Sequence, residues 1–424
     1  MLICLLIIEI IIMILISYIK FKKVILINNA FTLLWGIGII LSIIYSTNNK
    51  LVIPSSNLII MVMIVILVFN AFYFFLTPKK FFTFDIANEI YVNNQMIKIL
   101  FWIALILYMP NIINSLLIIA KSGLNFSLIR TLYLDMQVEG NGIYVYITKI
   151  IPNGIMNSLS IISAYYLTKK NLKLAKYGII LVGLSVLCFG GRNSILTLLE
   201  SYIISFCLLK EHTKKKLKLQ KRYIIIVIGI IIVLTFSRGL NGASFIDMIG
   251  TYFIQQFSFM QYILNNAGSY GIGELHYGYL SLGFIFAPFI LIFSLFFNNI
   301  KLPSYYFDIY AQNTINLSIQ RNVLKAINNN TTSLYNFILD FGMHFYYLGV
   351  ILYALIICIA QYNFKKNPNI GFNFFLLVYI YQTVLNSTIN YSLTNITVSF
   401  TLFFLYVLTR KFKFRFSNFS NKSV

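Results

Sequence analysis

Residues 57–77 read NLIIMVMIVILVFNAFYFFLT, and this stretch decides the fold class. It contains no charged residue and is long enough to cross roughly 30 Å of hydrocarbon as a helix. Similar stretches recur along the whole chain of 424 residues, of which 59% are hydrophobic and only 10% charged. Because every backbone polar group must be bonded internally within a bilayer, these stretches predict membrane-spanning α-helices.

We therefore predict an all-α, polytopic integral membrane protein, with residues 1–424 forming a single transmembrane domain of about 12 or 13 helices. The predicted spans are residues 2–19, 24–46, 57–77, 97–119, 143–168, 177–190, 193–209, 223–237, 280–298, 341–361, 371–388 and 392–409. A further stretch, 251–266, is short and contains polar residues. It would cross, re-enter or lie in the membrane interface.

The net charge of +22 is distributed as a topology signal, which argues against a nucleic-acid partner. If the basic clusters all face the cytoplasm, 24 of the 33 Lys and Arg residues lie inside. This orientation places the N-terminus outside and the C-terminus in the cytoplasm of a bacterial plasma membrane. It also requires an even number of crossings between residues 239 and 298, so either 251–266 crosses or 280–298, which contains Pro288, is re-entrant.

The chain outside the membrane lies mainly in three predicted outer segments, 120–142, 238–279 and 299–335, which leaves no soluble domain. The four cysteines fall in apolar stretches without paired spacing, so we expect inert thiols. The sequence has no Walker-type glycine loop, HExxH, CxxC or GxSxG, so ATP hydrolysis, zinc chemistry and α/β-hydrolase chemistry have no support.

Two arginines stand at the predicted outer ends of spans, where positive charge is unexpected. Gly190 and Gly191 precede Arg192, and paired glycines expose backbone N–H groups at the start of the next helix. The arginine adds a planar fork suited to phosphate oxygens, and Ser194 adds a donor. Arg238 repeats this arrangement, so both arginines would converge on one diphosphate. The alternative is two interfacial turns whose arginines reach lipid phosphates.

Lys149 and Glu200 are the charges that we place clearly inside spans, at similar depth below the outer surface. A charge in the membrane is costly and is by default functional or paired. Either these two residues pair with each other, or Lys149 is a third cation for the phosphates and Glu200 orients it.

The predicted outer segment around Glu274 and His276 is rich in glycine and tyrosine. A histidine or a carboxylate there would accept a proton from a sugar hydroxyl, and the tyrosines would stack on sugar rings. Both residues are bystanders on the alternative interpretation. Asp340 is expected to open the next span, either as a partner of the helix dipole or as part of the site.

These motifs resemble the Wzy-type oligosaccharide repeat-unit polymerases of bacterial O-antigen and capsule assembly. The resembling features lie between residues 190 and 350: GGRNS at 190–194, SRG at 237–239, the tyrosine-rich stretch from Tyr252 to Gly283, and ILDFGMHFYYLG at 338–349.

The resemblance implies a membrane glycosyltransferase that acts on the outer face and needs neither metal nor nucleotide. Its substrate would be a polyprenyl-diphosphate-linked oligosaccharide, such as one on undecaprenyl diphosphate, and it would work in membrane lipid beside a chain-length regulator and a flippase. Arg192 and Arg238 would bind the diphosphate with help from Lys149, and His276 or Glu274 would be the base. The alternatives are a flippase or transporter of the same lipid-linked sugar, and a related glycan ligase.

Overall fold

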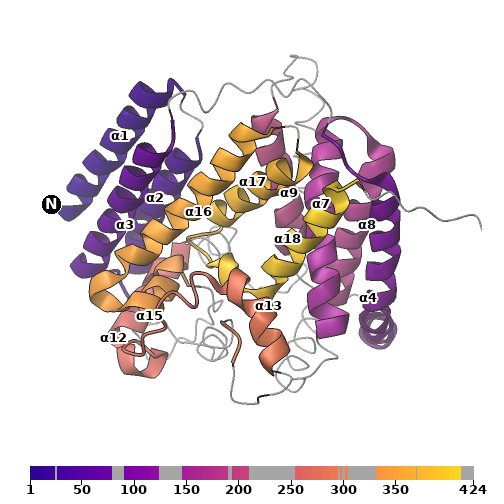
Figure 1. Ribbon diagram of the computed structural model, residues 1–424. Coiled ribbons are helices and arrows are strands. Elements are labelled where there is room, and N and C mark those ends of the chain that lie inside the picture. Colours follow the sequence, from indigo (N-terminus) through magenta and orange to yellow (C-terminus); the bar gives the residue numbers. More distant parts are fainter. Residues whose placement is uncertain are drawn as a thin grey trace, which may run out of the picture.

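The computed structural model describes residues 1–23, 26–78, 90–123, 146–189, 193–209, 254–294, 297, 301–303, 331–368 and 370–411. The regular secondary structure of these residues is helical (Figure 1). The elements are α1 (Leu2–Phe21), α2 (Ile27–Asn48), α3 (Ser56–Leu76), α4 (Asn94–Ser122), η1 (Tyr146–Ile150), α7 (Ile151–Thr168), α8 (Leu172–Phe189), α9 (Asn193–Leu208), α12 (Gln255–Asn265), η3 (Ala267–Tyr270), α13 (Gly283–Ser294), α15 (Ser333–Phe345), α16 (Tyr347–Lys366), α17 (Gly371–Leu385), η4 (Ser392–Thr394) and α18 (Ile396–Thr409).

Six of the described helices, α1, α2, α3, α4, α8 and α16, are long and apolar enough to cross a membrane. Four more, α9, α13, α17 and α18, are apolar but shorter. The predicted all-α fold is therefore confirmed for the described residues, and several of their helices have the length and composition of membrane spans. The predicted span at 223–237 lies outside them.

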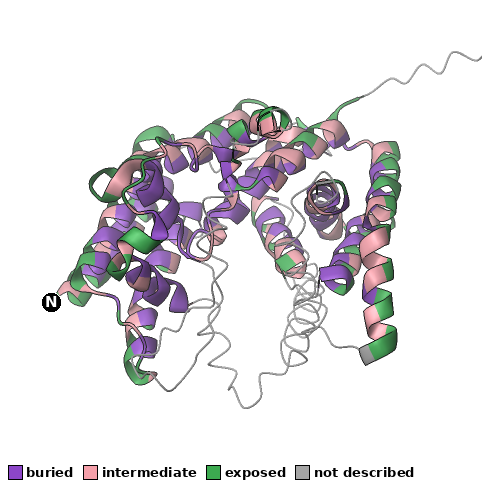
Figure 2. Ribbon diagram, turned by 90° about the horizontal axis from the view of Figure 1, so that it is seen from below, coloured by how far each residue is buried: buried purple, intermediate pink, exposed green. Residues whose placement is uncertain are grey.

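The described helices form two groups that α16, α17 and α18 join (Figure 1). On one side α1, α2 and α3 pack together, and α3 packs on α16. On the other side α7 packs against α4, α8, α9 and α18. α17 contacts α2, α9 and α16, and so connects the two groups. Exposed residues lie mainly on the outward faces of the bundle, and buried residues face its interior (Figure 2).

The start of α7 shows how proline and an amide side chain shape one helix. Pro152 has no N–H, so the carbonyl of Thr148, four residues earlier, loses its α-helical donor. The chain forms the π-helical turn η1 over Tyr146–Ile150, and the side-chain amide of Asn111 in α4 donates to the Thr148 carbonyl at 2.8 Å. The break in the helix is thus stabilised by a neighbouring helix.

The helices α12 and α13 lie in the two stretches, 251–266 and 280–298, whose membrane crossing the sequence left undecided. α12 has 11 residues and α13 has 12, including Pro288. At about 1.5 Å per residue each helix is roughly 16 to 18 Å long, about half the hydrocarbon thickness. As described, neither helix has the length of a full span.

Several basic helix ends gather on one side of the bundle. Lys20 at the end of α1 donates to the carbonyl of Phe74 near the end of α3, and α3 packs on α16, which ends in Lys365 and Lys366. In the other group, Lys411 after α18 lies over the ring of Tyr91 before α4. This arrangement agrees with the charge pattern. That the side faces the cytoplasm remains a prediction.

Candidate active site

The segment between η3 and α13 carries Glu274 and His276, and it docks on the end of α15. The backbone N–H of His276 donates to the carbonyl of Leu339 at 3.1 Å, and that of Tyr277 donates to the carbonyl of Asp340 at 2.8 Å. The Asp340 carboxylate accepts two further backbone N–H bonds, from Leu280 at 2.9 Å and from Ser281 at 2.6 Å. Four hydrogen bonds therefore fix the segment on two consecutive residues of α15.

Glycines allow the segment and α15 to approach closely. Gly342 has a φ of 78°, which ends the regular helix of α15 directly after this contact. A Cβ added to Gly342 would lie 3.2 Å from Cδ2 of Leu275, and one added to Gly278, whose φ is 87°, would lie 3.5 Å from Cζ of Phe341. Gly342 is thus favoured by both its positive φ and the tight approach of Leu275, whereas Gly278 is favoured by its positive φ alone.

Three side-chain hydroxyls also bond the backbone carbonyls of the docked segment. Tyr335 donates to the carbonyl of Tyr270 at 2.7 Å, and Tyr391 donates to the carbonyl of Ser281 at 2.9 Å. Thr394 donates to the carbonyl of Leu280 at 3.2 Å. These donors come from α15, from η4 and from the residue before η4, so three parts of the chain position the segment.

The site brings two carboxyl groups near one imidazole. Asp340 is 0% exposed, His276 is partly buried and Glu274 is exposed. Burial raises the pKa of Asp340, while hydrogen bonds from Ser281 and Leu280 and the charge of His276 oppose that shift. Burial lowers the pKa of His276 below 6.5, although the charges of Asp340 and Glu274 act in the opposite direction. The imidazole is therefore mainly neutral near pH 7, the form that accepts a proton.

One expectation about Asp340 is wrong. The sequence placed it at the start of a span over 341–361, but Asp340 lies in the last regular turn of α15, and the long helix α16 begins at Tyr347. The positive φ of Gly342 breaks the helix within an otherwise apolar stretch. The carboxylate binds the backbone of another segment and does not cap the following helix.

Glu200 lies in a separate polar cluster between α9 and α17. Its carboxylate accepts hydrogen bonds from the amides of Gln382 at 3.0 Å and Asn386 at 2.9 Å. Gln382 also donates to the carbonyl of Thr197 at 2.9 Å. Lys149 is not among the partners of Glu200, so the expected pair between these residues is not formed. Lys149 lies in η1, at the break before α7.

The structure describes only some of the residues predicted to bind the diphosphate. Gly190, Gly191, Arg192 and Arg238 lie outside the described residues. Ser194, in the first turn of α9, shares a hydrogen bond with Ser185 of α8, which ties the two helices together beside their connection. Of the predicted site residues, the structure brings together Glu274, His276 and Asp340.

The sequence analysis missed a third charge inside a predicted span. Glu9 lies within α1, and both of its carboxyl oxygens are buried without a hydrogen-bond partner. A single acidic residue in an apolar stretch is a signal that the sequence already carried. The amides of Gln382 and Asn386 were also missed, because neutral amides do not stand out in a predicted span.

No group of three or more His, Cys, Asp and Glu side chains within the described ranges could hold a metal ion. Comparison of the chain with protein-family models, with curated proteins and with solved structures finds no match.

Proposed function

We propose that this chain is a membrane-embedded polymerase of lipid-linked oligosaccharides, of the Wzy type that its motifs resemble. It would transfer a glycan from one polyprenyl diphosphate carrier to the terminal sugar of a second lipid-linked repeat unit, at the outer face of the plasma membrane. The product would be O-antigen, capsule or a similar exopolysaccharide.

The proposed reaction exchanges one bond for another. A hydroxyl oxygen of the acceptor sugar attacks the anomeric carbon of the donor glycan, and the bond between that carbon and the diphosphate breaks. The hydroxyl proton passes to the base, and polyprenyl diphosphate leaves with the bonding electron pair. The protein must therefore stabilise a departing anion and accept one proton.

The observation that carries the proposal is the docking of the His276 segment on Asp340. A mainly neutral imidazole lies beside a buried carboxylate, in a segment fixed by backbone hydrogen bonds. Such a group can accept a proton, and the neighbouring carboxylate stabilises the imidazolium that forms. The segment lies near the start of α16, a 20-residue helix roughly 30 Å long that ends in Lys365 and Lys366. The site is thus at the end of the bundle opposite these lysines.

The cationic residues of the proposed site are assigned from the sequence motifs. Arg192 and Arg238 would bind the leaving diphosphate through bidentate hydrogen bonds, with Lys149 assisting. We expect Arg192→Ala and Arg238→Ala each to abolish polymerisation while the protein stays in the membrane. Arg→Lys variants should recover only part of the activity, because a point charge does not reproduce the planar fork. Lys121→Ala removes another predicted outer cation without adjoining phosphate-site residues and is the matched control.

Purified protein in detergent, supplied with a lipid-diphosphate oligosaccharide, separates the proposal from its alternatives. Products longer than one repeat unit support a polymerase. A flippase would produce none, since transport changes no covalent bond. Normal product lengths from both arginine-to-alanine variants would contradict the diphosphate site.

A further inference from the structure

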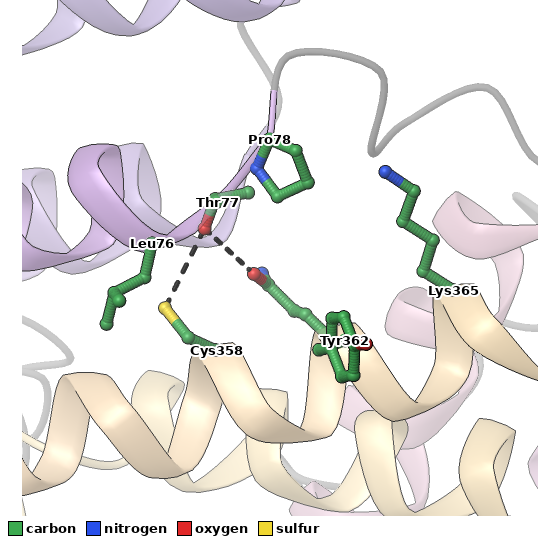
Figure 3. A pocket seen from close by; sticks show the side chains of 7 residues that line it. Leu76, Thr77, Pro78, Cys358, Tyr362 and Lys365 are labelled. Carbon is green, nitrogen blue, oxygen red and sulfur yellow. Dashed lines mark hydrogen bonds between the residues drawn. The ribbon is translucent and has the colours of Figure 1, made fainter.

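A second site is indicated at the opposite end of the bundle, where α3 meets α16. A small pocket there is lined by Leu76, Thr77 and Pro78 at the end of α3 and by Cys358, Gln361, Tyr362 and Lys365 of α16 (Figure 3). The proposed reaction uses none of these residues.

The interior of this pocket is polar and internally bonded. The Thr77 hydroxyl donates to Oε1 of Gln361 at 3.2 Å and contacts the sulfur of Cys358 at 3.7 Å (Figure 3). The Gln361 amide donates in turn to the hydroxyls of Tyr73 at 2.8 Å and Tyr381 at 2.7 Å. This network holds the wall of the pocket in place, so the pocket is built from fixed side chains.

The mouth of the pocket is cationic. Lys365 of α16 lines the pocket together with Pro78 (Figure 3). The next residue, Lys366, is exposed. Lys20 at the end of α1 bonds the carbonyl of Phe74, close before the pocket in α3. The neighbouring described stretches 15–23, 71–78 and 357–368 contain no Asp or Glu. Within these described stretches the charged side chains are all basic.

The pocket also opens beside an apolar surface. Leu76 is 38% exposed and Tyr362 is 60% exposed. Ile359, one turn deeper on the same side of α16 as Tyr362, is 57% exposed. An apolar strip along a membrane helix that leads to a polar, cationic pocket at the helix end matches the two parts of a phospholipid, the acyl chain and the phosphate.

We propose that this pocket binds an anionic phospholipid of the leaflet on the basic side of the bundle. The pocket is small, so a phosphate oxygen would enter it near Thr77 and Lys365, while the rest of the headgroup lies over the lysines. An acyl chain would follow Tyr362 and Ile359. Lipid bound here would link α3 to α16 and so brace the helix that leads to the proposed active site.

The test uses the full chain in nanodiscs made of equal parts phosphatidylglycerol and phosphatidylethanolamine, then released into detergent for native mass spectrometry. The wild type should retain phosphatidylglycerol in preference to phosphatidylethanolamine. The double variant Lys365→Gln/Lys366→Gln should retain roughly tenfold less, because each lysine near an anionic headgroup contributes to binding. Lys173→Gln/Lys176→Gln removes two exposed lysines from the start of α8 and is the matched control, which should retain normal amounts.

A third variant, Leu76→Trp, keeps every lysine and fills the pocket, and should also lose the bound lipid. Equal losses in the two lysine pairs, or normal retention by Leu76→Trp, would overturn the proposal, since attraction would then depend on overall charge. Displacement of the lipid by millimolar inorganic phosphate would overturn it as well, because the pocket would then recognise a free anion.

Discussion

The two ends of the bundle organise charge in opposite ways. At the end that carries the proposed active site, a buried carboxylate, that of Asp340, accepts backbone N–H groups from a loop. At the other end, lysines stand at the ends of α1 and α16 around a pocket whose polar groups bond one another. A negative charge thus orders the backbone at one end, whereas the positive charges at the other surround a pocket already ordered by neutral groups.

The two ends therefore suit two different tasks: one fixes the position of a chain segment, and the other attracts anions. A buried ion bonded to the backbone fixes geometry, because moving the segment would leave a charge and two N–H groups unpaired. Lysines on flexible stems attract anions without fixing their position. Bond-making chemistry needs the first kind of environment, and lipid binding needs only the second.

The largest expected effect tests which end faces outward. In a background without the exposed thiols of Cys4 and Cys207, a cysteine introduced at Ser269 should react with an impermeant maleimide on intact cells. A cysteine at Asn367, after the lysine end of α16, should react only after the membrane is opened. The result is close to all or none because the two positions lie on opposite sides. Labelling of position 367 in intact cells would reverse the orientation and place the proposed site in the cytoplasm.

The next effect concerns the chemistry at the outer end. His276→Gln should lower the turnover rate by roughly 10²–10⁴ while binding of the lipid-linked donor is retained, because the proton acceptor is lost. The measurement is product formation by purified protein beside donor binding. Lys173→Gln, an exposed position at the start of α8 with no role in either proposed site, should keep normal turnover. If His276→Gln keeps near-normal turnover, Glu274 becomes the next candidate base.

Asp340→Ala should destabilise the protein more than any exposed substitution in the same segment. It leaves the buried N–H groups of Leu280 and Ser281 without an acceptor, at a cost of about 3 kcal/mol. Thermal unfolding in detergent measures the loss. Glu274→Ala is the control, and because that residue is exposed its effect should stay within about 0.5 kcal/mol. Equal unfolding temperatures for the two variants would show that the docking contact does not contribute to stability.

The smallest effect is a shift in pH dependence. A base must be neutral, so the rate should be constant at high pH and fall as the pH decreases through the pKa of His276, which lies below 6.5. The charge of Glu274 raises this pKa, so Glu274→Gln should move the fall to lower pH. Glu274→Asp keeps the charge and should leave the profile in place. A shift to higher pH in Glu274→Gln would contradict the proposed electrostatics.

Long helices could be predicted from the sequence because apolar length alone specifies them. The stretch 57–77 is almost the whole of α3, and 2–19 agrees with α1. The start of α16 could not be predicted in this way, since the chain stays apolar across Gly342 and only backbone conformation marks the break. The stretch 251–266 stood out in the sequence but its placement stayed open, because polar residues interrupt it. The structure forms the short helix α12 there, with Gln255 and Gln256 among its buried residues.

The site was predictable as residue types but not as contacts. Glu274 and His276 stood out as titratable groups among glycines, and Asp340 as an acid beside an apolar stretch. Their proximity depends on backbone hydrogen bonds between segments about sixty residues apart, and no local pattern encodes such bonds. The hydrogen bonds from the amides of Gln382 and Asn386 to Glu200 could not be predicted either, because an amide side chain in an apolar stretch has many possible partners.

The indole N–H of Trp35 donates to the hydroxyl of Ser387 at 2.9 Å, although 352 residues separate the two in the sequence. A ribosome that has just released α2 into the membrane must therefore add most of the protein before this donor finds its acceptor. Until then the polar N–H faces lipid, a translocon or another helix. A chain truncated before α17 would consequently keep its early helices in the membrane with this contact unmade, and we expect quality-control proteases to recognise such a product.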